Sequence, residues 1–546
     1  MADSSPTPTD REHQLARLSS ESFDVLIIGG GITGAGVARD AAMRGLRVAL
    51  VEQDDFASGT SSRSSRLVHG GLRYLEHGQL GLVFESSRER RTLLRIAPHL
   101  VRPLSFVWPL YHRARVPGWK LRLGLTLYDA LSLFRNVERH QRLDARGVQS
   151  HEPRLSQTHL RGGARYWDAA TDDVRLTLAT VLSARQSGAV VANHTRVKGL
   201  RRSGGRIAGA TVVNTETGSS IDIDARLVVN ATGAWSDRVE RLANPAAVAA
   251  IRGSKGSHVM VPRSRVGNAS ALTLVAPQDG RVMFVLPAGA FTIIGTTDTY
   301  DQVAPEDVRA SHADVQYLLR TANHFFHDAH LAESDIVSAW AGLRPLASTG
   351  KDGDGPGGAS REHAIVETAP GLLRITGGKL TTYRAMAEEV VNHAERILGV
   401  RHRGSGTATA QLAGGDIGDV RRAMDDATST IGDGVVAERL VHAFGSAWRD
   451  VWKPTGSEPA LVQRIAPDRP YVLAELRYGV VHEMARTLAD LLVRRTPIAF
   501  ETPDHGRAAA RRVAPRVAEW LEWSAAETEA ALAAYDSEVA RMFTID

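Results

Sequence analysis

The feature that most limits what this chain can fold into is a glycine-rich turn, G-G-G-I-T-G, at residues 29–34. It follows a largely apolar run at 23–28, of the kind that forms a strand buried on both faces. A helix rich in small residues at 35–42 and a second apolar strand at 48–51 come next. The order strand, turn, helix, strand is a βαβ unit, which requires a parallel sheet.

The turn has the spacing G-x-G-x-x-G that binds the pyrophosphate of a dinucleotide. Gly29 permits the tight turn, Gly31 lets the backbone approach the pyrophosphate, and Gly34 allows helix and strand to pack closely. The positive end of the following helix favours the negative phosphates. Glu52 ends the second strand, where a carboxylate binds a ribose hydroxyl and repels a 2′-phosphate. A purely structural turn would leave Glu52 unexplained, so the segment predicts a dinucleotide site.

The fingerprint alone does not distinguish FAD from NAD. It lies at the N-terminal end of a chain of 546 residues, and no second fingerprint follows on a strand–helix junction. The segment 58–66, S-G-T-S-S-R-S-S-R, is rich in hydroxyl donors that could surround a second face of the pyrophosphate. The alternative for this segment is a solvated serine-rich loop. Together these features favour FAD as the cofactor.

The chain is too long for one compact core, so we expect two or three domains. Residues 1–21 are polar and predict a disordered tail. From residue 405 onward the apolar spacing becomes helical, so 405–546 predicts a separate helical domain. Within it, 484–492 carries apolar residues at helical spacing, and Ser524 begins a capping box ahead of the last helix.

Composition and motifs exclude or disfavour several classes of protein. The absence of cysteine rules out disulfides, thiolate metal sites and a redox-active cysteine pair. His482 and Glu483 lack the second histidine of a zinc-protease motif, and we expect no metal. The formal net charge of +5 is weak support for any anionic partner, and we expect no nucleic-acid contact. Without a signal sequence or a run of 18 apolar residues, we expect a cytoplasmic protein, in solution or on a membrane surface.

Six segments, in this order along the chain, resemble the FAD-dependent, quinone-linked glycerol-3-phosphate dehydrogenase family. They cover roughly residues 22 to 400, and the strings H-G-G-L-R-Y-L-E and G-G-K-L-T-T-Y-R are the most specific. The segments are S-S-R-L-V-H-G-G-L-R-Y-L-E-H (64–77), V-N-A-T-G-A-W (229–235), K-G-S-H-V-M-V-P (255–262), I-I-G-T-T-D (293–298), A-G-L-R-P-L (341–346) and T-G-G-K-L-T-T-Y-R (376–384).

The resemblance implies an α/β FAD-binding fold, Rossmann-like and of the p-hydroxybenzoate hydroxylase and glutathione reductase type. It also implies an α+β substrate domain built on an antiparallel sheet, and a C-terminal helical domain. The FAD-binding and substrate domains interleave within 22–404. The FAD-binding parts are expected at roughly 22–75, 165–255 and 335–404, and the substrate parts at roughly 76–164 and 256–334.

The resemblance implies oxidation of sn-glycerol 3-phosphate to dihydroxyacetone phosphate by hydride transfer to FAD, with electrons passed to a membrane quinone. It further implies peripheral attachment to the cytoplasmic face of the inner membrane, and a homodimer is an open expectation. The apolar stretch 119–134, with basic residues at its start, fits either a membrane interface or buried packing. Two alternatives keep the fold: an oxidase that uses oxygen, and another flavoenzyme acting on an alcohol or an amine.

A phosphomonoester dianion requires fixed positive charge, and arginine suits it because its planar fork pairs two oxygens. By family position the resemblance places Arg344 and Arg361 at the phosphate. Ion pairs on the surface are the alternative for such arginines. The residues expected around the substrate are Arg73, Tyr74, Thr296, Arg344, Arg361 and Lys379.

Oxidation of an alcohol also needs a base for the hydroxyl proton, and histidine is suited to this near neutral pH. His258 is the first candidate and His69 the second, and Lys379 could stabilise the alkoxide or the reduced flavin. The expected catalytic residues are therefore His258, Lys379 and Arg344. A helix predicted from Thr381 would aim its N-terminus at the flavin.

The fingerprint and the resemblance together predict a long series of cofactor contacts. They are Gly29, Gly31, Ile32, Thr33, Gly34, Glu52, Thr60, Ser61, Ser62, Ser65, Arg66, Leu67, His69, Gly70, Gly71, Val197, Ala231, Thr232, Gly233, Trp235, Gly378, Lys379, Leu380 and Thr381.

Overall fold

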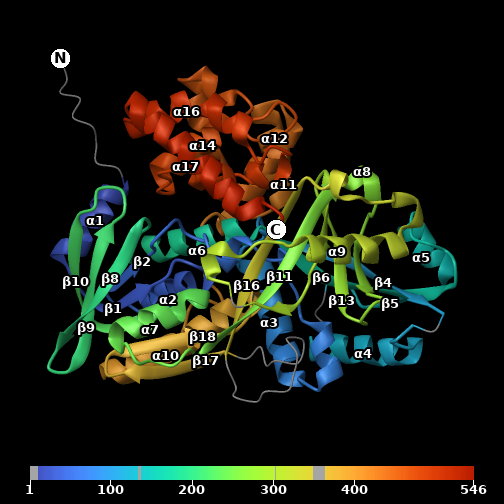
Figure 1. Ribbon diagram of the computed structural model, residues 1–546, viewed down its shortest axis with the longest axis horizontal. Coiled ribbons are helices and arrows are strands. Elements are labelled where there is room, and N and C mark those ends of the chain that lie inside the picture. Colours follow the sequence, from blue (N-terminus) through green and yellow to red (C-terminus); the bar gives the residue numbers. More distant parts are fainter. Residues whose placement is uncertain (1–9, 113, 133–136, 302, 348–362) are drawn as a thin grey trace.

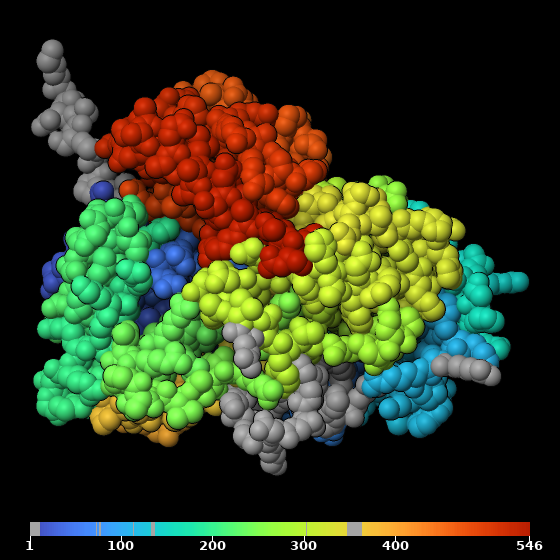
Figure 2. Space-filling model, in the orientation of Figure 1, coloured from blue at the N-terminus to red at the C-terminus, as the bar shows by residue number. Residues whose placement is uncertain are grey.

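The chain forms two β-sheets side by side, with a C-terminal group of helices lying against both (Figure 1). The computed structural model describes residues 10–112, 114–132, 137–301, 303–347 and 363–546. Figure 2 shows the C-terminal helices, in red, resting on segments of both sheets. Among the described residues, no helix combines the length and the apolarity needed to cross a bilayer.

The first sheet has a parallel core and contains the predicted βαβ unit. Its strand β1 (Ser22–Ile28) is buried from Val25 onward and pairs in parallel with β2 and β10. This agrees with the apolar runs from which both strands were predicted. Across the sheet the order is β17 (Ala364–Ala369), β18 (Leu372–Thr376), β10 (Ser220–Asn230), β1, β2 (Val48–Val51) and β7 (Val190–Ala192), with β9 (Arg206–Asn214) beside β10 and β8 (Thr195–Ser203) beside β9.

Three helices pack together at the first sheet. They are α2 (Ile32–Met43), α6 (Asp173–Gln186) and α10 (Tyr383–Leu398), and α2 packs against the other two. A Cβ on Gly36 would lie 2.9 Å from the Tyr383 ring, so glycine is needed for this close contact. The helices predicted at 35–42 and from residue 381 are confirmed.

The second sheet is almost entirely antiparallel. Strand β6 already begins at residue 160, and β16 belongs to this sheet, so the domain boundaries predicted at 165 and 335 do not coincide with the division between the sheets. Its strands are β3 (Leu67–Val68), β4 (Val101–Tyr111), β5 (Gln141–Leu143), β6 (Leu160–Thr171), β11 (Ile251–Pro262), β12 (Ala271–Val275), β13 (Val282–Ala288), β14 (Phe291–Gly295), β15 (Thr299–Tyr300) and β16 (Ser338–Ala347). The remaining helices before residue 405 are α1 (Asp10–Ser20), α3 (Leu80–Ile96), α4 (Gly118–Leu131), α5 (Ala145–His151), α7 (Ser236–Ala243), α8 (Arg263–Val266) and α9 (His312–Phe325).

The C-terminal region is helical, and the capping box at Ser524 is present, with its hydroxyl accepting a hydrogen bond from the Glu527 amide. The helical spacing predicted through 484–492 is confirmed only from Leu488 onward. The backbone turns at Met484 with a φ of 59°, and the helix begins at Leu488 and continues as a short π-helix over Asp490–Arg495. The helices are α11 (Val420–Ile431), α12 (Gly434–Phe444), α13 (Trp448–Trp452), α14 (Leu473–His482), α15 (Ile498–Glu501), α16 (Arg507–Leu521) and α17 (Ala525–Phe543).

Buried ion pairs join the C-terminal region to the first sheet. Arg494 and Arg495 approach the Asp55 carboxylate at 2.9 and 2.6 Å. Arg175 of α6 forms a two-pronged pair with Glu483, at 2.9 and 2.8 Å. Because all these side chains are nearly inaccessible to solvent, the pairs tie the two regions together.

The disordered tail predicted for residues 1–21 is wrong for residues 10–20, which form α1. Leu18 is fully buried against the first sheet, and the Arg11 guanidinium donates to the Asn193 carbonyl at 3.0 Å. The polar composition did not predict this helix, because one or two buried leucines are enough to dock it on the sheet. Residues 1–9 lie outside the described residues.

Candidate active site

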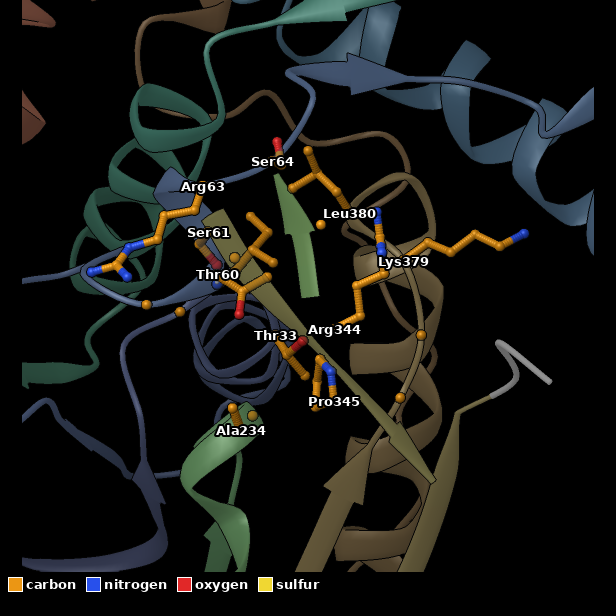
Figure 3. A pocket seen from close by; sticks show the side chains of 18 of the residues that line it. Thr33, Thr60, Ser61, Arg63, Ser64, Ala234, Arg344, Pro345, Lys379 and Leu380 are labelled. Carbon is orange, nitrogen blue, oxygen red and sulfur yellow. Dashed lines mark hydrogen bonds between the residues drawn. The ribbon is translucent and has the colours of Figure 1, made fainter. Parts of the chain in front are cut away.

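An elongated cavity of about 590 Å³ runs from the glycine-rich turn to the strands of the second sheet. Figure 3 shows Thr33, Thr60 and Ser61 on one side of it, Leu380 and Lys379 on the opposite side, and Arg344 between them. The two sides come from segments more than 300 residues apart in the chain. The cavity therefore brings the predicted nucleotide fingerprint and the predicted substrate residues into one space.

At the nucleotide end the backbone of the glycine turn forms the wall. Gly29 has a φ of 110°, and a Cβ there would lie 2.7 Å from the Ala231 carbonyl oxygen. A Cβ on Gly34 would overlap the Gly29 carbonyl, which explains the requirement for glycine at both positions. The Ile32 amide at the start of α2 donates to the Ser61 hydroxyl at 3.0 Å. The turn is thus a narrow backbone cradle at a helix N-terminus, as a pyrophosphate requires.

Glu52 occupies the position expected of a ribose-binding carboxylate. It accepts hydrogen bonds from the amides of Gly30 at 2.7 Å and Asp54 at 3.1 Å. Burial, with the nearby charge of Asp54, raises the pKa of Glu52 to about 7. A hydroxyl donor placed beside this carboxylate would favour its charged form.

The serine-rich segment 58–66 is not a solvated loop. Thr60 and Ser61 line the cavity, and the Thr60 hydroxyl donates to the Leu343 carbonyl at 2.6 Å. Ser62 and Arg63 are buried. The segment therefore forms the wall of the cavity that faces β16.

At the other end, two loops from distant parts of the chain are bonded together. The His69 amide donates to the Thr381 hydroxyl oxygen at 3.1 Å, and that hydroxyl donates to the His69 carbonyl at 3.2 Å. The Gly70 amide donates to Asp168 at 3.0 Å, and Asp168 also pairs with Arg90. The H-G-G and G-G-K-L-T-T strings thus build one wall of the cavity.

Arg344 lies in β16 and reaches the cavity between strands of the second sheet. One terminal nitrogen approaches Asp298 at 3.1 Å and the Ser254 hydroxyl at 3.3 Å. The other lies 3.2 Å from the Thr296 hydroxyl. A Cβ on Gly256 would overlap this guanidinium, so the glycine of K-G-S-H makes room for it. Its side chain is 22% exposed, and it is held in position at the cavity wall.

The two candidate histidines differ in their surroundings. His258 is buried, stacks on Trp340 with ring centres 5.3 Å apart, and places Nε2 2.8 Å from the Ser65 hydroxyl. Burial, reinforced by Arg344 and Arg66, lowers the pKa of His258 to about 3. His69 is only half-buried in the cavity wall, with its ring edge-on to Phe284.

Three of the other predicted substrate residues line the cavity. Tyr74 and Lys379 line the cavity, with the Lys379 ammonium 3.7 Å from the centre of the Tyr74 ring. Thr296 also lines it. The side chain of Arg73 and the whole of Arg361 lie outside the described residues.

Most of the predicted cofactor residues line the cavity, and four do not. Gly34 is a packing contact behind the turn, and Gly70 packs against Tyr128. Ser62 donates to the Gly59 carbonyl at 3.2 Å. Arg66 lies over the Phe500 ring of the C-terminal region, 4.9 Å from its centre. The lining residues are Gly29, Gly31, Ile32, Thr33, Glu52, Thr60, Ser61, Ser65, Leu67, His69, Gly71, Val197, Ala231, Thr232, Gly233, Trp235, Gly378, Lys379, Leu380 and Thr381.

Sequence reasoning missed two charged residues at the substrate end. Arg281 lines the cavity and donates to the Asp298 carbonyl at 2.6 Å, and Asp298 holds Arg344. Asp298 closes the string I-I-G-T-T-D, but nothing in that string indicates an ion pair with Arg344. Arg281 precedes β13 and has no motif around it, so only the pairing of the strands brings it to the site.

One cluster outside this cavity has the geometry of a metal site. Asp55, His194 and Asp490 place their ligand atoms within 4.8 Å of one another. Arg494 already pairs with both Asp55 and Asp490, and Arg495 pairs with Asp55. The cluster is therefore explained as a buried ion-pair network.

Comparison with known proteins identifies the family. Residues 24–391 match the family model described as FAD dependent oxidoreductase, and residues 405–528 match the C-terminal domain of alpha-glycerophosphate oxidase. The chain is 39% identical, over 97% of its length and 90% of the relative's, to glycerol-3-phosphate dehydrogenase 2 of Mycobacterium tuberculosis strain H37Rv. This chain belongs to the FAD-dependent glycerol-3-phosphate dehydrogenase family.

Other members and a solved structure agree. The glycerol-3-phosphate dehydrogenase of Synechocystis is 35% identical over 93% of this chain and 94% of its own. The crystal structure of the Bacillus halodurans glycerol-3-phosphate dehydrogenase complexed with FAD has a TM-score of 0.81 and 29% identity, covering 98% of this chain and 99% of that one. The cofactor is FAD, and the glycine cradle, Glu52 and the serine-rich wall fit its nucleotide half.

Proposed function

We propose that this protein oxidises sn-glycerol 3-phosphate to dihydroxyacetone phosphate and passes the electrons to a membrane quinone. The observation that carries the proposal is the placement of Arg344 in the wall of the flavin cavity, with Arg281 nearby and Thr296 between strands of the same sheet. Two guanidinium groups beside a hydroxyl suit a phosphate dianion. The names of the relatives give the same substrate.

The residues at the site have separable tasks in this reaction. Arg344 and Arg281 bind the phosphate and fix the C2 carbon near the flavin, and Asp298 holds Arg344 in its orientation. FAD, when bound, supplies the acceptor for the C2 hydride. Lys379 lies at the other wall, where an ammonium group lowers the cost of negative charge on the alkoxide or on the reduced ring.

We assign the C2 hydroxyl proton to His69 rather than to His258. A base works best when its pKa lies near the pH of the reaction. The pKa of His258 is lowered to about 3, and its Nε2 faces Ser65. His69 lies in the cavity wall on the loop bonded to Thr381 and is partly accessible. His258 is then a neutral ring that positions Ser65.

Anaerobic addition of glycerol 3-phosphate to the oxidised holoenzyme tests the proposal. The yellow absorbance of the flavin should bleach, and dihydroxyacetone phosphate should form in equal amount. Glycerol and glycine, which lack the phosphate, serve as controls for another alcohol or amine oxidoreductase. A flavin that stays oxidised with glycerol 3-phosphate, or that bleaches equally with either control, contradicts the substrate assignment.

Two electron acceptors suit this fold, a membrane quinone and oxygen. The match of residues 405–528 to a domain named for an oxidase favours oxygen as a second candidate. A mixed apolar and basic surface on α3 and α4 favours a membrane quinone. Its exposed apolar side chains are Leu80, Phe84, Trp119 and Leu123, at 44, 41, 68 and 62% exposure, and Lys120 and Arg122 are exposed beside the last two.

Flotation with vesicles containing anionic lipid tests this surface. The wild-type protein should float with the vesicles, and the double variant Trp119→Gln, Leu123→Gln should remain at the bottom of the gradient. Stoichiometric peroxide release during turnover, with no stimulation by a quinone analogue, would favour the oxidase instead.

A further inference from the structure

A second cavity, of about 510 Å³, lies where the C-terminal helices meet the loops of the first sheet. One side of it is formed by the segment after β2 and the start of β8, including Asp54 and Arg196. The opposite side comes from α17 and the segment before it, including Trp523 and Arg541. The cavity is continuous with the nucleotide end of the active-site cavity, because the two linings share six residues: Gln53, Ser58, Arg63, Arg196, Trp235 and Arg238.

Arg63 is the unusual group in this cavity. It is only 7% exposed, and among the described residues no hydrogen bond or ion pair is formed by its guanidinium, whose Nε is fully enclosed. Figure 3 shows its side chain pointing away from Thr60, Thr33 and Arg344, at the edge of the active-site cavity that it also lines. Burial lowers the pKa of Arg63 to about 10. A buried guanidinium in this state is costly without an anionic partner.

The negative charge available nearby is already shared. Glu538, the strongest attractive charge on Arg63, is paired with Arg541 and lies 3.5 Å from Arg494. Arg494 is in turn bonded to Asp490 at 2.8 Å. Three guanidinium groups therefore surround Glu538, and Asp54 is a second carboxylate that attracts both Arg63 and Arg541.

We propose that this second cavity is a binding site for a phosphate-type oxyanion, beside the nucleotide end of the flavin site and distinct from the substrate site. Arg63 and Arg541 provide its binding groups, because they approach it from opposite sides and guanidinium forks pair oxyanions bidentately. A volume of about 510 Å³ admits a phosphate ester as well as free phosphate. Since Arg63 closely follows the cavity-lining residues Thr60 and Ser61, and Arg541 belongs to α17, a bound anion stabilises the docking of the C-terminal helices on the flavin-binding region.

Thermal unfolding of the FAD-loaded enzyme in inorganic phosphate, with sodium chloride holding the ionic strength constant, tests the site. Phosphate should raise the Tm saturably. Because phosphate also resembles the substrate, the measurement is repeated in Arg344→Met, where the second site is intact and the stabilisation should remain. In Arg541→Gln the dissociation constant should rise about tenfold or more. Arg63→Met should have the same effect if it folds with FAD.

Glu538→Gln provides a test of opposite sign. It removes the carboxylate that competes for the three arginines, so phosphate should bind several-fold more tightly than to the wild type. Pyrophosphate and glycerol 3-phosphate, titrated into Arg344→Met, distinguish free oxyanions from phosphate esters as the natural source. The proposal is overturned if phosphate leaves the wild-type Tm unchanged, if Arg344→Met abolishes the shift, or if Arg541→Gln and Glu538→Gln both leave it unaltered.

Discussion

The two ends of the active-site cavity are built in different ways. At the nucleotide end the chain offers backbone amides, glycines and one carboxylate, Glu52, all within residues 29–61. At the substrate end it offers charged side chains, Arg344, Arg281 and Lys379, carried by three separate segments. The first end depends on local conformation, and the second depends on the pairing of distant strands. Substitutions at the nucleotide end should therefore cause loss of FAD, and substitutions at the substrate end should weaken substrate binding.

The largest effect should come from Gly34→Ala at the nucleotide end. The added methyl group would overlap the Gly29 carbonyl, which is backbone and cannot move without opening the turn. We expect loss of FAD, measured as the ratio of flavin to protein absorbance after purification. Gly81→Ala is the matched control, because a Cβ there meets nothing within 4 Å. Full FAD content in Gly34→Ala would show that the turn is less rigid than described.

Removal of the proposed base should give the next largest effect, without loss of FAD. His69→Asn should lower kcat by about 10²- to 10⁴-fold, the usual contribution of general base catalysis. His258→Asn should lower kcat less than His69→Asn, because a pKa of about 3 makes His258 a poor base near neutral pH. Stopped-flow flavin reduction measures both variants, and a larger loss in His258→Asn would reverse our assignment.

Arg344→Met should weaken substrate binding while leaving FAD bound. Loss of charge-assisted hydrogen bonds worth about 1.5–3 kcal/mol corresponds to about a ten- to hundredfold fall in kcat/KM. Arg265→Met is the control, because Arg265 pairs with Asp335 at 3.1 Å outside the cavity. If the two variants have the same kinetics, Arg344 does not bind the phosphate.

The smallest effect concerns the pH dependence of FAD binding. Because the pKa of Glu52 is raised to about 7, the carboxyl is mostly protonated below that pH and ionised above it. The ionised form accepts ribose hydroxyls better, so FAD affinity should rise several-fold between pH 6 and pH 8. Reconstitution of the apoprotein, followed by flavin fluorescence, measures this. Glu52→Gln should give a flat profile, and a flat wild-type profile would contradict the prediction.

The same contrast explains how far the sequence could be interpreted. The βαβ unit and its glycines are specified by neighbouring residues, so strand, turn and helix were predicted at nearly the right positions. The contact of Arg344 with Ser254 depends on the register of β11 and β16, which places those two residues opposite each other. No local pattern fixes that register, so family resemblance rather than spacing pointed to Arg344, and Arg281 was missed.

Errors in the sequence predictions have a common physical origin. Helix α1 was missed because its polar surface outweighs the single buried Leu18 and the anchoring Arg11. The helix expected from Met484 begins only at Leu488, because the Asp490 carboxylate accepts hydrogen bonds from the amides of Arg486 and Thr487 and so caps the helix there. In both places a charged side chain also binds a partner more than 150 residues away: Arg11 binds Asn193, and Asp490 binds His194.

The pairing of Asp55 with Arg494 and Arg495, and of Arg175 with Glu483, has a consequence for biosynthesis. A ribosome releases Asp55 and Arg175 hundreds of residues before it releases their partners Arg494, Arg495 and Glu483, so both early charges must stay hydrated in the meantime. Asp55 and Arg175 therefore cannot reach their final packing until residues 483–495 have been made, and we expect this part of the flavin-binding region to complete its folding late in synthesis.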